Sequence, residues 1–417
     1  MKNARTKTKK HSVISLRLSP ISLLLCIALL AALLTDSVQA QDWRFEPIVK
    51  FGVEYDDNAT LRIRTDEEVV LEGLLLDIRA DINYVSPTTS FFLQPRALLR
   101  NYPNEPDFDT DDYFLRSLFR HRGESSTIGF RVTYDQQAIR TAERDISDLE
   151  IDDPTELTDD DTGLVLFFGS RNKLRISPYW NYRLSNVSSI GADIDYYDVR
   201  YADFFAGFLS DYTDARLNLN YRRNFSSVFA GLLTVTARKF DTSVELSDIT
   251  GSGLQVGFER ELSEKMQLTV MIGVEDTDHE SVETDPEVVG NVTLIRNLET
   301  IRLLARYRRS IAATGAGRLS VRDSINLNFR RRLSEKIIAG LGVRAYQSRG
   351  IGGLPSIDDR NYIQLQSSFL WYLTQSMVIE ADYRYTILDR TELDGGRSNS
   401  NQINLWFVYQ PRTIPRI

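Results

Sequence analysis

The chain contains very little cysteine and histidine. Its 417 residues include one cysteine, Cys26, and three histidines. Cys26 lies in an apolar N-terminal run, so we expect a mature chain without disulfides, cysteine metal sites or a catalytic thiol. His121 and His279 remain for acid–base chemistry, but they are far apart in the sequence and no motif links either to a partner. The sequence therefore predicts no catalytic residue, no metal site and no cofactor.

Long apolar runs are missing beyond the N-terminus. No segment after residue 40 approaches 18 consecutive apolar residues, so we expect no membrane-spanning helix there. Before it, six basic residues precede the uncharged run Ile21–Leu34, and small residues follow in SVQA at 37–40. This arrangement is typical of a secretory signal peptide, residues 1–40, cleaved between Ala40 and Gln41. Because the basic region is long, an uncleaved anchor is the alternative.

Basic charge is scarcer than acidic charge. The chain has 50 Lys and Arg against 58 Asp and Glu; removing residues 1–40 takes away six basic groups and one acidic group, which leaves 44 against 57, or −13. This balance argues against nucleic acid as a partner. The segment 139–160 alone carries nine acids. We expect a solvated external loop there; cation bridging to lipopolysaccharide and folding inward as a constriction are the alternatives.

Alternation of apolar and polar residues is abundant. In LRISPYWNYRL, Leu174–Leu184, every second residue is apolar or aromatic and the others are mostly polar. The same period of two recurs in segments such as 74–84, 215–222, 301–308 and 403–409. It predicts β-strands whose two faces meet different environments, in a soluble sandwich or in a membrane barrel. No helix is expected after residue 40.

Two further patterns favour the barrel. Aromatic residues such as Trp43, Trp180 and Trp406 gather near strand ends, where interfacial girdles lie in outer-membrane proteins. Short connections, LSEK at 262–265 and 333–336 and GSRNK at 169–173, alternate with long ones such as 101–111 and 276–289. We predict an all-β fold: a single antiparallel transmembrane β-barrel over residues 41–410, with 18 strands or alternatively 16, and a short C-terminal tail at 411–417.

Arginine is prominent opposite the apolar faces. The candidate lumen-lining residues are Arg79, Arg96, Arg100, Arg175, Arg183, Arg216, Arg222, Arg302, Arg306, Arg308, Arg330 and Arg384. Arginine binds carboxylates through two parallel hydrogen bonds, and rings of arginine select anions in pores, so these residues indicate a pathway for an anionic glycan. The alternative is a structural ladder in which they pair with acids such as Asp77, Asp81, Asp382 and Glu259 on neighbouring strands. Both interpretations can hold together.

Two segments resemble a known group. VEYDDNATL at 53–61 is similar to the opening of porin-like outer-membrane β-barrel proteins associated with exopolysaccharide biosynthesis and export. ARYRRSIAATGAGRLSVRDSINLNFRRRLSEK at 305–336 resembles their late segment, and the tail after residue 410 departs from it. The resemblance covers most of the mature chain and implies an outer-membrane component of polysaccharide secretion. It carries no catalytic residue.

The predicted function is therefore a porin-like conduit in the bacterial outer membrane, involved in exopolysaccharide export by diffusion through an arginine-lined lumen. A structural or docking barrel without transport is one alternative, and a hydrolase built on a barrel is another. The expected partners are outer-membrane lipids, lipopolysaccharide, the barrel assembly machinery and an anionic polysaccharide with its export proteins.

Overall fold

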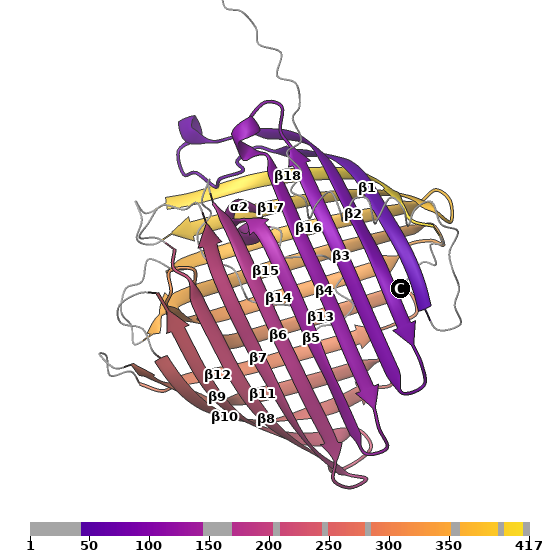
Figure 1. The fold of residues 1–417 in the computed structure, drawn as a ribbon, viewed down its shortest axis with the longest axis vertical. Coiled ribbons are helices and arrows are strands. Elements are labelled where there is room, and N and C mark those ends of the chain that lie inside the picture. Colours follow the sequence, from indigo (N-terminus) through magenta and orange to yellow (C-terminus); the bar gives the residue numbers. More distant parts are fainter. Residues whose placement is uncertain are drawn as a thin grey trace, which may run out of the picture.

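One closed sheet forms the protein. The computed structural model describes residues 43–144, 169–202, 209–243, 249–279, 285–351, 359–390 and 396–411. In these residues, 18 antiparallel strands pair in chain order. The first strand, β1 (Trp43–Asp56), also pairs with the last, β18 (Gly396–Tyr409), which closes the barrel (Figure 1). The predicted all-β fold and the strand number of 18 are thus confirmed.

The strands between them are long and regular. The first half of the wall continues with β2 (Leu71–Val85), β3 (Thr89–Asn101), β4 (Thr110–Arg122), β5 (Ser126–Ala138), β6 (Ser170–Arg183), β7 (Ser188–Ala202), β8 (Tyr212–Asn224) and β9 (Phe229–Thr242). The second half consists of β10 (Ile249–Ser263), β11 (Met266–His279), β12 (Glu287–Asn297), β13 (Ile301–Ala313), β14 (Leu319–Arg332), β15 (Ile337–Gly350), β16 (Arg360–Tyr372) and β17 (Met377–Arg390). Strands of 11 to 15 residues, once tilted, can cross a bilayer.

Several predictions fall on segments outside the described residues. They include the signal peptide with its Ala40–Gln41 cleavage site, residues 145–160 of the acidic segment, and residues 412–417 of the tail.

Short and long connections lie at opposite ends of the barrel. The short ones, such as 264–265 and 333–336, share the end at which β1 begins and β18 finishes, which is the periplasmic end in barrels of this kind. The two LSEK turns are therefore where the sequence predicted them. GSRNK is not: Ser170 to Lys173 begin β6 at the long-connection end, because the alternation of inner and outer side chains continues back through them.

Within the described residues, helical structure is confined to three short pieces. They are α2 (Ile139–Arg144), η1 (Thr65–Glu67) and η2 (Pro106–Phe108), so the expectation of no helix was wrong at these points. None of the helices in the described part of the chain is long and apolar enough to cross a membrane.

The outer face of the barrel is apolar. Side chains such as Phe51, Leu219, Val256 and Ile272 point outward and are 48–58% exposed. Near the periplasmic end, Trp180 stacks on Tyr182 with their ring centroids 5.9 Å apart, as expected for an interfacial aromatic girdle. A closed barrel satisfies its backbone hydrogen bonds internally, and lipid is the solvent in which such an apolar outer surface is stable. The chain is an outer-membrane β-barrel.

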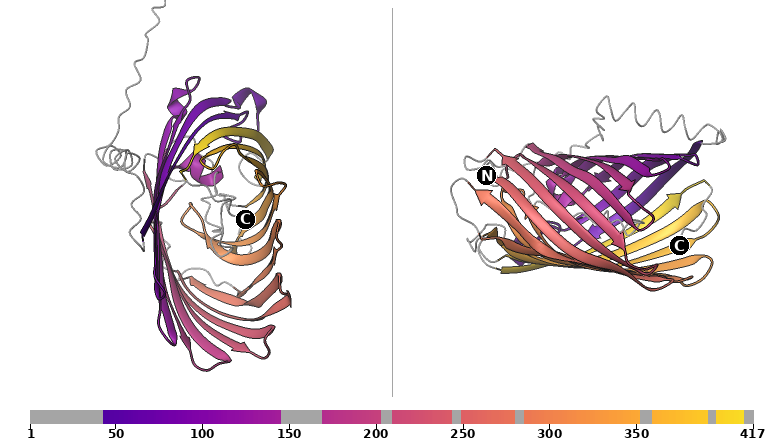
Figure 2. Two further views of the ribbon diagram at one scale, coloured as in Figure 1. Left: turned by 90° about the vertical axis from the view of Figure 1, so that its right-hand side faces the viewer. Right: turned by 90° about the horizontal axis from the view of Figure 1, so that it is seen from below.

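The barrel is flattened in cross-section (Figure 2). Its sheet turns most sharply around β8–β11 (Figures 1 and 2). Inner positions there are crowded. A Cβ at Gly257 would lie 2.0 Å from the Val270 carbonyl oxygen, and one at Gly273 would lie 1.9 Å from that of Leu254. Glycine at these inner positions allows neighbouring strands to approach around the bend.

The two faces can be compared at adjacent residues of β10. Val256→Arg places a guanidinium against lipid, and we expect it to reduce the free energy of unfolding by about 2–4 kcal/mol. Gln255→Arg places the same group on the wet inner face, where a change within about 0.5 kcal/mol is expected. Urea titrations of barrels refolded into lipid vesicles measure both variants. Equal losses would contradict the assignment of the faces.

Candidate functional site: the external mouth of the lumen

The twelve arginines predicted to line the lumen all occupy inner-face positions of described strands. They are distributed over β2, β3, β6, β8, β13, β14 and β17. In each strand they alternate with outward apolar side chains; Arg216, for example, precedes Leu217, which is 39% exposed. The structure therefore spreads them around the wall and does not gather them into a single ring. Their role in conduction stays a prediction.

Several of these arginines form the interstrand ladder that the sequence offered as an alternative. Arg96 Nε lies 3.0 Å from Asp77 Oδ1, and Arg222 Nη2 lies 2.7 Å from Glu259 Oε1. Arg175 pairs with Asp195 at 2.8 Å. Such pairs lower the cost of placing charge inside the barrel. Part of the arginine set thus has a structural role.

The β1–β2 connection folds inward at the external mouth. Asn58 Nδ2 donates to the carbonyl oxygens of Arg62 and Asn399, both at 2.9 Å, and Asn58 Oδ1 accepts from the Arg62 backbone N–H at 3.0 Å. These bonds tie the connection to β18. Leu61 is held at a φ of 49° and is fully buried in a cluster with Tyr346, Tyr362 and Leu388.

The first turn of α2 is a second inward segment. Asp112 on β4 accepts hydrogen bonds from the Thr141 hydroxyl and the Ala138 backbone N–H, each at 2.9 Å, and also pairs with Arg100. Residues 139–142 are nearly fully buried. The acidic segment was expected to be a solvated loop; its first four residues instead enter the mouth, because Asp112 and an apolar cluster hold them there.

A charged network lies beside this turn. The Tyr102 hydroxyl donates to Glu54 Oε1 at 2.8 Å, and the guanidinium of Arg140 lies 5.4 Å from the centre of the Tyr102 ring. Burial raises the pKa of Tyr102 above its ordinary value, and the Glu54 carboxylate raises it further. Burial alone would lower the pKa of Arg140, but Tyr102 and Glu54 outweigh it, so this pKa is raised. Tyr102 therefore remains a neutral donor and Arg140 a cation.

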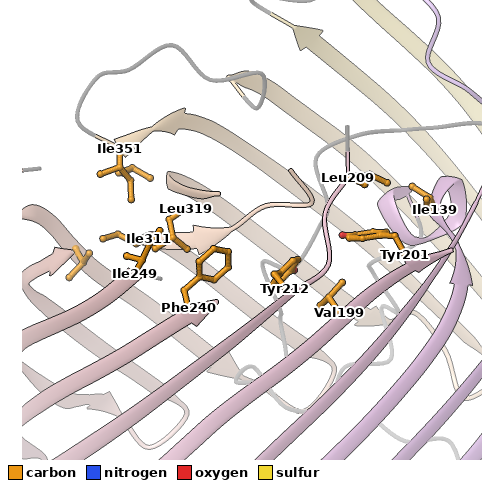
Figure 3. Packing of buried hydrophobic residues seen from close by; sticks show 12 residues of the cluster. Ile139, Val199, Tyr201, Leu209, Tyr212, Phe240, Ile249, Ile311, Leu319 and Ile351 are labelled. Carbon is orange, nitrogen blue, oxygen red and sulfur yellow. The ribbon is translucent and has the colours of Figure 1, made fainter. Parts of the chain in front are cut away.

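The tip of the β13–β14 hairpin, residues 310–322, is the third inward segment. Its apolar side chains belong to a buried cluster that also contains inner-face residues of β7–β10. Figure 3 shows Ile311 and Leu319 beside Phe240 and Ile249. The mouth is therefore narrowed by three segments from different parts of the chain.

One wall of the lumen carries charge of a single sign. The inner positions of β13–β16 hold Arg302, Arg306, Arg308, Arg322, Arg330, Arg332, Arg344 and Arg360. The one acid in these four strands, Asp323, is on the outer face, where it accepts hydrogen bonds from Tyr307 and Arg309. We name this surface the arginine wall.

At the external end of the arginine wall, three guanidinium groups surround one ring. The guanidinium carbons of Arg322, Arg360 and Arg344 lie 4.9, 5.3 and 5.5 Å from the centre of the Tyr346 ring. That ring stacks on Tyr362 at 4.9 Å. Aromatic faces stabilise nearby cations, which offsets part of their mutual repulsion.

Sequence reasoning missed four members of the arginine wall, namely Arg322, Arg332, Arg344 and Arg360. The signal was present for Arg322 and Arg332, because the alternation around Ile325 and Leu327 assigns both to the inner face when it is extended in either direction.

Of the two histidines, His121 lies at the periplasmic end of the barrel, away from the mouth. His121 Nδ1 is 2.9 Å from the Thr89 hydroxyl oxygen, next to a periplasmic turn. The side chain of His279 lies outside the described residues.

Asp112 provides a test of the α2 attachment. We expect Asp112→Ala to lower the free energy of unfolding by about 3–5 kcal/mol, because Arg100 would remain buried without its carboxylate. The exposed neighbour Asp111 is the matched control, and Asp111→Ala should change stability by no more than about 0.5 kcal/mol. Urea titration of both variants in detergent measures the difference. A loss that is the same for both would refute this account of the α2 attachment.

Comparison with known proteins shows that this chain resembles solved outer-membrane proteins in fold. No family model matches the chain, and no curated protein matches it by sequence. The outer membrane channel DcaP of Acinetobacter baumannii is similar over 89% of this chain and 97% of its own, at 11% identity and a TM-score of 0.45. OccK5 (OpdH) of Pseudomonas aeruginosa is similar over 88% and 98%, at 9% identity and 0.42. The siderophore receptor PirA from Pseudomonas aeruginosa is similar over 88% and 80%, at 11% identity and 0.39. These similarities concern the barrel fold and extend no further.

Proposed function

We propose that the protein is a porin-like conduit that conducts anionic solutes across the outer membrane. The arginine wall is the observation that carries this proposal. Guanidinium groups stay charged at every physiological pH, so the wall provides a fixed positive field along the lumen. Clefts lined by one sign of charge concentrate the opposite ion within them.

The arrangement of the wall suits a chain of anions better than a single trapped ion. Arg302 and Arg330 lie toward the periplasmic end of the wall and are partly exposed. Arg306 and Arg344 both pair with Asn326, near the middle of their strands. Arg360 lies near the mouth and is buried. Cationic groups at several levels let an anion pass from one to the next without any site binding it too tightly to leave. Asn326 and Asn328 add polar side chains to the same inner face.

The finer proposal is that the anionic solute is an acidic exopolysaccharide. Its carboxylates would pair with the guanidinium groups through two parallel hydrogen bonds. The sequence resemblance described above supports this cargo, and the arginine wall is compatible with it. Diffusion through the lumen would then be passive, with direction supplied by other components.

Ion selectivity tests the conduit. We expect Arg302→Gln, Arg306→Gln and Arg330→Gln, combined in one protein, to move the reversal potential in a salt gradient toward cation selectivity, because the wall loses three positive charges. The matched control replaces Arg260, Arg296 and Arg331, which are exposed on the outer face, by glutamine and makes the same change in net charge. Planar bilayers measure both. A shift of equal size in the control would refute the role of the wall.

A docking barrel without transport is the second candidate. The inward segments at the mouth favour it, since they occupy space that a wide channel would leave open. Planar-bilayer recording separates the two functions. Stable single-channel steps support the conduit, whereas a correctly refolded barrel with no current supports the docking role.

The cargo requires a cellular experiment. We expect a strain lacking this protein to retain the polysaccharide inside the envelope and to secrete less of it, with secretion restored by the unaltered gene. Measurement of uronic acid in the medium and in the periplasm gives both quantities. Unchanged secretion would remove exopolysaccharide as the cargo and would leave anion conduction intact.

A further inference from the structure

We propose that the tip of the β13–β14 hairpin, residues 310–322, is the constriction of this conduit. It caps the external end of the lumen sector bounded by β8–β12 and confines passage to the remainder of the lumen. This inference rests on the proposed conduit function and names the element that sets its width.

The first observation is a set of hydrogen bonds across the lumen. Arg216 Nη2 on β8 donates to the Ile311 carbonyl oxygen at 2.7 Å, and Arg238 Nη1 on β9 donates to the same oxygen at 3.2 Å. β8 and β13 are five strands apart around the wall. Arg216 and Arg238 are inner-face side chains, so the backbone at Ile311 lies inside the lumen.

A second contact holds the turn of the hairpin. The Ser210 backbone N–H donates to the Gly315 carbonyl oxygen at 2.8 Å, which joins the β7–β8 connection to the hairpin turn. The turn itself closes through Gly317, whose φ of 70° favours glycine and whose N–H donates to the Thr314 carbonyl oxygen at 3.1 Å. The hairpin is therefore held at its side and at its tip.

The second observation is burial on both faces of the hairpin. Toward the membrane centre, the outward side chains Tyr307 and Ile325 are 42% and 44% exposed. At the outer positions closer to the tip, beyond the Arg309–Asp323 pair, Ile311, Leu319 and Val321 are at most 6% exposed. Because these residues keep the outer parity of their strands, they can be buried only if the hairpin leaves the wall and bends inward.

The packing partners give the direction of the bend. Ile311, Leu319 and Val321 share one apolar cluster with inner-face residues of the opposite sector, Tyr212 of β8 and Phe240 of β9 (Figure 3). The hairpin thus leans over β8–β12, the sector that contains the sharp bend around β8–β11. Its other side carries Arg322, which lies over Tyr346 at the external end of the arginine wall.

The hairpin is held by arginine side chains that are themselves fixed in position. Arg238 makes two parallel hydrogen bonds to Asp214, at 2.8 and 2.9 Å, so its remaining amino group is fixed in position for the Ile311 carbonyl. Two pre-positioned guanidinium groups on one carbonyl oxygen hold the hairpin more firmly than loop contacts with solvent would. We therefore expect a constant constriction in the resting channel.

Shortening the hairpin tests its effect on conduction. Ser310 and Arg322 are paired in the ladder, so residues 311–321 can be replaced by Asn-Gly, which closes a two-residue hairpin at that pair. We expect the single-channel conductance of this variant in planar bilayers to rise about twofold or more, as a wider lumen passes more ions. Arg318→Ala is the control, since Arg318 is exposed at the tip and its loss leaves the hairpin in place.

The inward position of the hairpin can be tested without a conductance measurement. In a Cys26→Ser background, Ser210→Cys and Gly315→Cys together should form a disulfide in the membrane, because the backbones at these positions are hydrogen-bonded. Gel mobility with and without reductant, and mass spectrometry of the linked peptides, measure it. Each single-cysteine variant serves as the control.

The outcomes separate the two proposals. Raised conductance of the shortened variant together with the disulfide supports the constriction. Unchanged conductance, with anion selectivity retained, overturns the constriction and leaves the conduit standing. Absence of current from both the unaltered and the shortened barrel overturns the conduit. If the shortened variant does not refold, failure of the cysteine pair to link overturns the inward position of the hairpin.

Discussion

Closure of the sheet between β1 and β18 is the constraint on which the rest of the structure depends. Once those strands pair, every strand has two neighbours and no edge is exposed to lipid. Each residue of the wall must then face either acyl chains or the lumen, and this choice produces the alternation along the sequence. Closure of a flattened barrel also forces a sharp bend around β8–β11, where Gly257 and Gly273 relieve crowding on the inner side.

The lumen carries its charge in two ways, and they differ in energetic consequence. In β2–β8, arginines such as Arg96 and Arg175 form ion pairs with carboxylates of adjacent strands, which limits both their desolvation cost and the field that they project. In β13–β16 the inner positions of the described strands hold arginine and no acidic residue, which makes this side of the lumen positive. The first arrangement stabilises the wall, and the second gives the lumen its positive charge.

The sequence predicted the features that follow from the alternation of apolar and polar residues. It failed where the face of the strand on which a residue lies no longer decides whether the residue meets lipid. The closed barrel and the inner placement of arginines such as Arg306 follow from period two, and the strand number follows from it together with the even count usual in bacterial barrels. The inward hairpin does not, since Ile311, Leu319 and Val321 keep the outer parity of Ile325. The charged pair Arg309 and Asp323 separates them from it and does not by itself reveal the inward bend. Only the contact with Phe240 and the bonds from Arg216 and Arg238 distinguish them, and both depend on strands about 70 to 100 residues away. The short helix α2 was missed for a similar reason, because Asp112 holds its first turn through tertiary bonds.

The two segments that carried the family resemblance turn out to build the mouth. Residues 53–61 contain Asn58, whose amide ties the β1–β2 connection to β18, and Leu61, which is buried against Tyr346 and Tyr362. Residues 305–336 contain the hairpin and Arg322, which contacts the same Tyr346 ring. Membrane-spanning strands require only alternation, which many sequences satisfy, whereas an inward segment requires particular donors, turns and apolar contacts. The parts of this barrel that are particular to its sequence are therefore the segments that leave the wall, and these are the segments that narrow its mouth.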